Sequence, residues 1–254
     1  EPDIVSYSTL LDAHAVAGDA AGARQVLDEM LQQHIKPNVI SCNTMIKACA
    51  RSRDAAGAER VLREMRRQLL EPSLVSYTNL VVAHAQVGDA TGAQQALEEM
   101  RHRRLQPNMV SYNALMKAHS KAGDAAVAER LFASLPRHSL EPNVVSLNTL
   151  IDAHAEAGDA PGAEAALAHA RWLRLEPNDV SHNALLKAHL RAGHFADAWC
   201  ALERMRSCGL QPNARSYTML IAASAKHADA AGAERAFEGL RRDGLVPDLV
   251  CWDT

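Results

Sequence analysis

Histidine is the residue type in this chain whose spacing comes nearest to that of a chemical site. It recurs at one position of a thirty-five-residue period, at His14, His84, His119, His154 and His189, and Cys49 and Ser224 fill the two remaining places. Imidazole nitrogens bind zinc when several of them converge on one ion. Residues that recur once per repeat lie along a line instead. We therefore predict that these histidines pack near a helix end and that the chain holds no metal.

The other candidate chemical groups also favour structural roles. The cysteines include no C-x-x-C pair, which indicates free thiols rather than a zinc site or a disulfide framework; they are Cys42, Cys49, Cys200, Cys208 and Cys251. The recurring G-D-A-A-G segments lack the lysine of a phosphate-binding loop and follow no strand. Neighbouring carboxylates such as Asp28 and Glu29 fit a solvated helix face better than an acid–base pair. We predict no catalytic residue and no cofactor.

Composition limits the class of protein. Of 254 residues, 48% are hydrophobic and only 4% aromatic, which suits many thin helix–helix contacts better than one deep core. The formal net charge of −3 means that any basic surface must be local. No apolar run reaches the ~20 residues that a membrane helix needs. Because the chain starts without methionine and stops within a repeat, we expect a segment of a longer protein.

Proline sets the register of an internal repeat. It recurs at a constant spacing of thirty-five residues, at Pro2, Pro37, Pro72, Pro107, Pro142, Pro177, Pro212 and Pro247. A fixed period of this length is typical of a stacked array of helical hairpins. The repeats run over 4–38, 39–73, 74–108, 109–143, 144–178, 179–213 and 214–248, and an eighth begins at 249–254. We predict one array of this kind over the whole chain.

Each repeat is expected to form two helices. A serine that recurs in all seven repeats, as at Ser76, is predicted to be the N-cap of the first helix. A glycine such as Gly88 ends that helix, and an aspartate such as Asp89 caps the second. Two positions are alanine in every repeat, which allows close and regular helix crossings. The predicted fold is all-α, a right-handed α-solenoid superhelix of stacked helix–turn–helix repeats.

Three residues interrupt the pattern. Pro136 is expected to truncate the second helix of the fourth repeat, because proline cannot continue a helix interior. Trp172 and Trp199 indicate local repacking in the fifth and sixth repeats. A partner surface that includes either tryptophan is the alternative.

The repeat resembles the pentatricopeptide repeat family in its plain thirty-five-residue class. V-S-Y-N-x-L opens the first helix, A-G-D stands at the turn, and P-N or P-D closes the repeat; the nearest match is VSYNALMKAHSKAGDAAVAERLF, residues 110–132. The resemblance covers essentially the whole chain. The tetratricopeptide array, which has thirty-four residues per repeat, would have drifted out of this proline register.

This resemblance implies a protein that binds single-stranded RNA and reads one base per repeat. In the family, the fifth and thirty-fifth residues of a repeat read the base. Here those pairs are Ser8 with Asn38, Asn43 with Ser73, Thr78 with Asn108, Asn113 with Asn143, Asn148 with Asn178, Asn183 with Asn213, and Thr218 with Asp248. The family's code converts them into the sequence 5′-ACAYYYG-3′, where Y is a pyrimidine. Asn, Ser and Asp after proline are also ordinary turn residues, which is the alternative at any one position.

Two further sets of residues follow from the resemblance or fit it. In the family, the second residue of a repeat sandwiches the bases; here these residues are Val5, Ile40, Val75, Val110, Val145, Val180, Arg215 and Val250. Arg215 departs from the apolar pattern. Basic residues stand before several turns and fit phosphate contacts, although a solvated helix end explains them as well; they are Arg51, Lys121, Arg191 and Lys226.

The function expected from the resemblance is RNA binding without catalysis in this segment, by a monomer in a chloroplast or mitochondrion. It would serve RNA processing, stabilisation or translation. Two alternatives stay open: a protein-binding scaffold of the tetratricopeptide kind, and the RNA-targeting part of a longer protein with a catalytic domain elsewhere.

Overall fold

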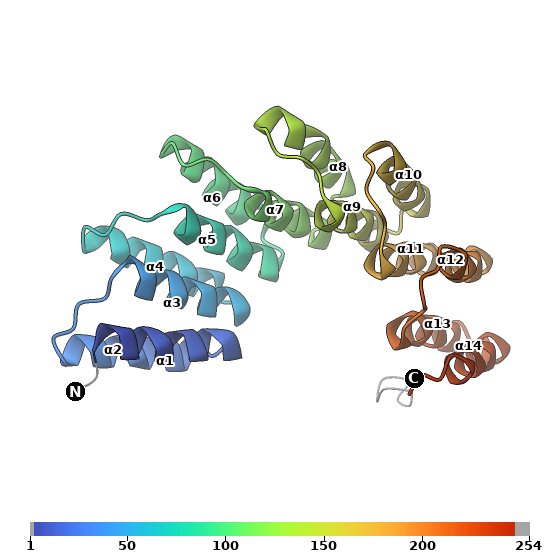
Figure 1. Ribbon diagram of the computed structural model, residues 1–254, viewed down its shortest axis with the longest axis horizontal. Helices are drawn as coiled ribbons and strands as arrows, with labels where there is room; N and C mark the ends of the chain where they lie inside the picture. The colour runs from blue at the N-terminus through green and yellow to red at the C-terminus, as the bar shows by residue number, and fades with distance from the viewer. Residues whose placement is uncertain (1–2, 247–254) are drawn as a thin grey trace. The chain divides into compact units, whose positions relative to one another are not determined.

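The computed structural model describes residues 3–246, and all regular structure in that range is helical (Figure 1). Along the described chain, the α-helices follow one another in seven helix–turn–helix repeats: α1 (Ile4–Ala17) and α2 (Ala20–Gln32), α3 (Val39–Arg51) and α4 (Ala55–Arg67), α5 (Leu74–Val87) and α6 (Ala90–His102), α7 (Met109–Lys121) and α8 (Ala125–Ser134), α9 (Val144–Ala157) and α10 (Ala160–Trp172), α11 (Asp179–Arg191) and α12 (Phe195–Ser207), α13 (Ala214–Lys226) and α14 (Ala230–Arg242). The predicted all-α class and helix–turn–helix architecture are confirmed.

The first helix of each hairpin begins one turn earlier than predicted. The N-cap is the residue after the proline, as at Asn38, whose extended backbone (φ −112°, ψ 179°) precedes α3 and whose side chain accepts the N–H of Ser41. Ser41 is therefore the third helical residue, and its hydroxyl accepts the N–H of Asn38 in return. The prediction that the serine caps the helix is wrong, because both residue types cap well and the serine acts as the second half of a capping box.

The second helices begin as predicted, with one exception. An aspartate side chain accepts the N–H of the third helical residue in six repeats, through Asp19, Asp54, Asp89, Asp124, Asp159 and Asp229. In the sixth repeat, His194 stands at this place and makes no such bond. Glycine adopts the left-handed conformation after five of the first helices, as predicted, for example at Gly88 (φ 80°), whereas Arg53 adopts φ 59° after α3. An arginine in that conformation is not foreseeable from turn propensities.

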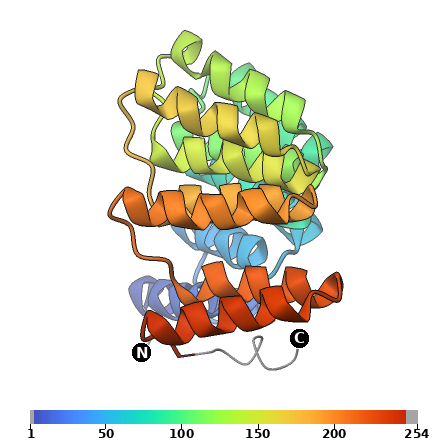
Figure 2. The same ribbon diagram turned by 90° about the vertical axis from the view of Figure 1, so that its right-hand side faces the viewer.

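The chain divides into two compact units, residues 3–122 with 137–140 and residues 123–136 with 141–246. In the first unit, α1, α3, α5 and α7 pack in sequence, and each second helix also contacts the first helix of the next repeat (Figure 1). In the second unit, α9, α11 and α13 pack in the same way, and the hairpin of α13 and α14 is visible in red in Figure 2. Within each unit, successive repeats thus bury their apolar faces against one another.

Alanine, methionine and branched aliphatic side chains fill the contacts between helices. The recurring alanines Ala83 and Ala93 are completely buried, as are Met65 and Met100. A buried tyrosine near the start of a first helix also joins neighbouring repeats through its hydroxyl. Arg66 donates to Tyr77 at 2.8 Å while it holds Glu99 of the next second helix at 2.5 Å.

The three interrupting residues behave in different ways. The α-helical part of α8 ends at Ser134, and a short 3-10 helix (Leu135–His138) contains Pro136, as expected. Trp199 is partly buried against the core formed by α11 to α14, and the guanidinium carbon of Arg235 lies 4.1 Å from the centre of its ring. Trp172 is 87% exposed. Trp199 therefore contributes to packing, and Trp172 does not.

Within residues 3–246, every helix is too short or too polar to cross a bilayer.

Candidate nucleic-acid interface

The second residue of each described repeat is an exposed side chain in the first turn of a first helix. Six of these side chains are apolar and between 50% and 65% exposed: Val5, Ile40, Val75, Val110, Val145 and Val180. Arg215 is exposed at the same place in α13, and Val250 lies outside the described residues. Single exposed apolar residues are common on proteins, but a row at one repeat position is unusual. Within each unit, these helices pack side by side, so all of them except α13 present an apolar side chain at the same end.

The polar residues predicted to read bases lie next to this row, and three of the pairs are joined by hydrogen bonds. The asparagine at the fifth position donates from Nδ2 to the side chain of the thirty-fifth residue. Asn43 donates to Ser73 at 3.4 Å, Asn148 to Asn178 at 3.2 Å, and Asn183 to Asn213 at 3.4 Å. The structure thus brings together two positions that are thirty residues apart in sequence.

A third residue, which sequence reasoning did not assign to the site, fixes the orientation of these asparagines. It is the third-position serine of the following repeat. Its hydroxyl donates to the asparagine Oδ1, from Ser76 to Asn43 at 2.5 Å, from Ser181 to Asn148 at 2.5 Å and from Ser216 to Asn183 at 2.6 Å. One Nδ2 hydrogen is used and Oδ1 accepts the serine hydroxyl, so the asparagine keeps one free N–H donor and one lone pair on Oδ1.

The thirty-fifth residue has a structural task of its own. Asn178 and Asn213 are the N-caps of α11 and α13, and their Oδ1 atoms accept the N–H of the serine three residues on. The turn and capping explanation for these residues is therefore correct. It leaves their Nδ2 groups as the atoms available to a ligand, although Asn213 Nδ2 also lies 3.3 Å from Asp179 Oδ2.

The repeats with a hydroxyl at the fifth position differ. Thr78 is only 8% exposed, and its Oγ1 has no hydrogen-bond partner among the described residues. Thr218 Oγ1 donates to the carbonyl oxygen of Ala214 at 2.9 Å, as is common for threonine in a helix. Ser8 is partly exposed in α1.

Three of the predicted base-reading pairs rest on the sequence alone. Asp248, the partner of Thr218, lies outside the described residues. Asn113 and Asn143 belong to different units. Asn38, the partner of Ser8, caps α3, and its Oδ1 accepts the N–H and the hydroxyl of Ser41.

Three of the four basic residues before the turns make bonds within the protein. Each donates to a main-chain carbonyl at the end of the preceding first helix, thirty-five residues back. Arg51 donates to Val16 at 2.6 Å, Lys121 to Gln86 at 2.6 Å, and Arg191 to Glu156 at 2.8 Å. A cation at a helix C-terminus is favoured by the helix dipole. These exposed residues therefore hold neighbouring repeats together, and their phosphate role stays a prediction, as does that of the exposed Lys226.

The histidines at the end of the first helices pair with the aspartates that cap the second helices. Nδ1 lies 2.9 Å from the carboxylate in His14–Asp19 and 2.8 Å in His84–Asp89 and His154–Asp159. The N–H of Gly92 holds the pKa of Asp89 below its ordinary value, and the His84 imidazole lowers it further. These pairs were not predicted from the sequence. The constant spacing of five residues between histidine and aspartate is the sequence feature that could have indicated them.

Comparison with known families and structures identifies this arrangement. The model described as "PPR repeat family" matches residues 2–51, 107–156 and 177–226, more than half of the chain. The "Pentatricopeptide repeat domain" matches residues 60–122, and the "PPR repeat" matches residues 40–68. Comparison with curated protein sequences gives no match.

Solved structures share the fold. The pentatricopeptide repeat protein PPR10 in complex with an 18-nt psaJ RNA element is 24% identical, with a TM-score of 0.88 over 99% of this chain and 37% of that one. A structure of PPR10 from maize is 25% identical, with a TM-score of 0.73 over 100% of this chain and 36% of that one.

A third structure covers less of this chain. The PPR domain of protein-only RNase P 1 from Arabidopsis thaliana, in complex with tRNA, is 19% identical, with a TM-score of 0.54 over 70% of this chain and 94% of that one. Since it covers 37% of PPR10, this chain spans little more than a third of the length of that protein. On the family matches, it belongs to the pentatricopeptide repeat family.

Proposed function

We propose that this chain binds single-stranded RNA, one base per repeat, with a preference for 5′-ACAYYYG-3′, and that this segment carries out no catalysis. The observation that supports the proposal best is the row of exposed apolar side chains at the second repeat position, beside the polar pairs at the fifth and thirty-fifth. The apolar side chain at the second position can contact the face of any base, whereas the amides at the fifth and thirty-fifth positions can form hydrogen bonds with its edge. Affinity and base identity are thus assigned to different atoms.

The hydrogen bonds suggest how an asparagine pair distinguishes bases. With Oδ1 turned toward the serine, the fifth-position asparagine can direct its free N–H donor at a base. A donor suits the O2 oxygen, which cytosine and uracil share, and it does not discriminate between them. This agrees with the assignment of asparagine pairs to either pyrimidine. Thr78 has a buried hydroxyl without a partner among residues 3–246, and an adenine edge would satisfy it.

The proposal is supported by likeness to solved complexes. PPR10 and the RNase P domain, both family members, were solved with RNA bound. By the same family membership, we propose an organellar transcript as the target and its processing, stabilisation or translation as the outcome. Residues of a longer protein outside this segment could add a catalytic domain.

The test is a binding titration with labelled RNA containing ACACCUG, beside a scrambled RNA and the DNA of the same sequence, at two salt concentrations. We expect the designed RNA to bind most tightly and its affinity to fall as salt rises, because phosphate contacts release counterions. Equal binding of the designed and scrambled RNAs would contradict the code. No binding to any RNA would favour the scaffold that binds protein.

A further inference from the structure

The turn between α11 and α12 departs from the other repeats in one chemical respect. The N-cap of the second helix is an aspartate in all the other repeats, but in the sixth repeat it is His194. His189 is one of the recurring histidines, so this repeat has lost the partner of its imidazole. The third repeat retains the histidine–aspartate pair and shows which contacts His189 lacks.

The third repeat is that reference. His84 Nδ1 lies 2.8 Å from the capping Asp89, and its Nε2 lies 3.4 Å from Glu59 of the preceding repeat. In the sixth repeat, the Nε2 side is unchanged, because Glu164 Oε1 lies 3.2 Å from His189 Nε2. The Nδ1 side has no carboxylate at the cap.

His189 is consequently a buried imidazole without satisfied hydrogen bonds. It is 3% exposed, and neither ring nitrogen has a partner in hydrogen-bond geometry among the described residues; the approach of Glu164 is close but poorly aligned. A buried polar group without a partner is rare in folded proteins, and where one occurs a bound ion can supply the missing contact.

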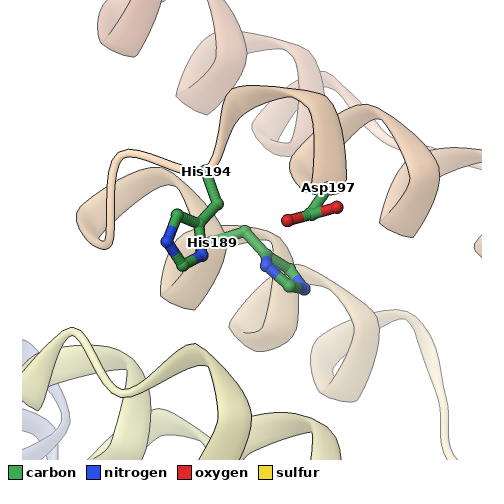
Figure 3. A group of neighbouring side chains, drawn as sticks. All are labelled: His189, His194 and Asp197. Carbon is green, nitrogen blue, oxygen red and sulfur yellow. The ribbon is translucent and has the colours of Figure 1, made fainter.

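The groups around the turn are those of a metal site. His189, His194 and Asp197 each bring one ligand atom within 4.8 Å of the others (Figure 3). Two imidazoles and a carboxylate suit zinc and similar transition ions. Ligand bonds of about 2.0 to 2.2 Å require the atoms to move closer. His194 and Asp197 are exposed and can rotate, whereas His189 is held by its packing.

We propose that His189, His194 and Asp197 bind one divalent transition-metal ion of the zinc class, with water completing its coordination. Glu164 stands behind His189 as the carboxylate that commonly orients a metal-bound imidazole. Arg204 holds Glu164 at 2.9 Å and partly neutralises it. The ion joins the end of α11 to the start of α12, a link that the histidine–aspartate pair supplies in the first, third and fifth repeats. The ligands belong to a single turn, so the array of repeat-equivalent histidines plays no part.

The experiment is isothermal titration calorimetry of the whole chain with zinc chloride. The informative variant is His194→Asn, because asparagine is a better helix N-cap than histidine and the fold is expected to be at least as stable. We expect one ion per wild-type chain and at least ~10-fold weaker binding in His194→Asn and in Asp197→Asn. Zinc should also raise the melting temperature of the wild type but not of these variants.

Cys200 provides the control for an alternative ligand, since it is an exposed thiol in α12. Cys42 and Cys49 are less suitable ligands because burial raises the pKa of each thiol to about 11. Cys200→Ser is expected to bind zinc like the wild type. Loss of binding in Cys200→Ser, or equal affinities in His194→Asn and the wild type, would overturn the proposed site.

Discussion

Removal of the Ser216 hydroxyl should change which base the sixth repeat prefers. That hydroxyl donates to Asn183 Oδ1 at 2.6 Å and accepts the N–H of Asn213 at 3.2 Å. In Ser216→Ala the asparagine amide can turn over and present its oxygen to the base. A carbonyl oxygen accepts from the amino group of adenine, so adenine should be rejected less strongly.

The magnitude follows from the bonds that are lost. A net hydrogen bond contributes about 1 kcal/mol, so the discrimination between uracil and adenine should fall about fivefold. The loss of two bonds should also cost about 2 kcal/mol of unfolding free energy. Binding must therefore be measured well below the melting temperature of the variant.

The assay is a competition between RNAs that differ only at the sixth base, ACACCUG and ACACCAG. Ser111→Ala is the matched control. Ser111 occupies the same repeat position, but its hydroxyl donates to the carbonyl oxygen of Asn108 at 2.8 Å, and the preceding repeat has Thr78 in place of an asparagine. The control should leave the sixth-base ratio unchanged. If Ser216→Ala also leaves that ratio within twofold of the wild type while both RNAs still bind, the orienting role of the serine is refuted.

Further predictions concern the exposed apolar residue Val75, the helix N-cap Asp89 and the two tryptophans. Val75→Ser should weaken RNA binding by about 1 kcal/mol, or fivefold, through lost apolar contact, whereas Val87→Ser, an exposed valine at the other end of α5, should leave the titration unchanged. Asp89→Ala should cost about 1 kcal/mol in thermal unfolding at pH 7. Because the pKa of Asp89 is lowered in the folded state, its contribution is present above the ordinary value of 3.8 and lost as pH falls through the lowered one. The deficit of the variant should therefore shrink at pH 3, and a constant deficit would contradict the ionised cap. Trp199→Ala should lower the melting temperature by several degrees, and Trp172→Ala should leave it unchanged; the reverse order would contradict the burial of Trp199.

The repeat and the places of its helices follow from local features of the amino-acid sequence. Each proline and each capping aspartate affects only the helix end beside it. The effects can therefore be deduced from the sequence without knowledge of tertiary contacts. Even there, the choice between Asn38 and Ser41 as N-cap was missed, because both types cap well and only the backbone conformation decides between them. The exposed face at Val75 could be placed only through resemblance to the family.

The bonds that polar side chains make between repeats depend on how the helices pack. Ser216 meets Asn183, and Arg51 meets the carbonyl of Val16, only because successive hairpins stack at one crossing, and no local propensity encodes a bond over thirty-three or thirty-five residues. The same stacking buries His189 beside Glu164. The sequence shows that His194 replaces an aspartate there, but only packing shows that the His189 imidazole has no hydrogen-bond partner in the described part of the chain.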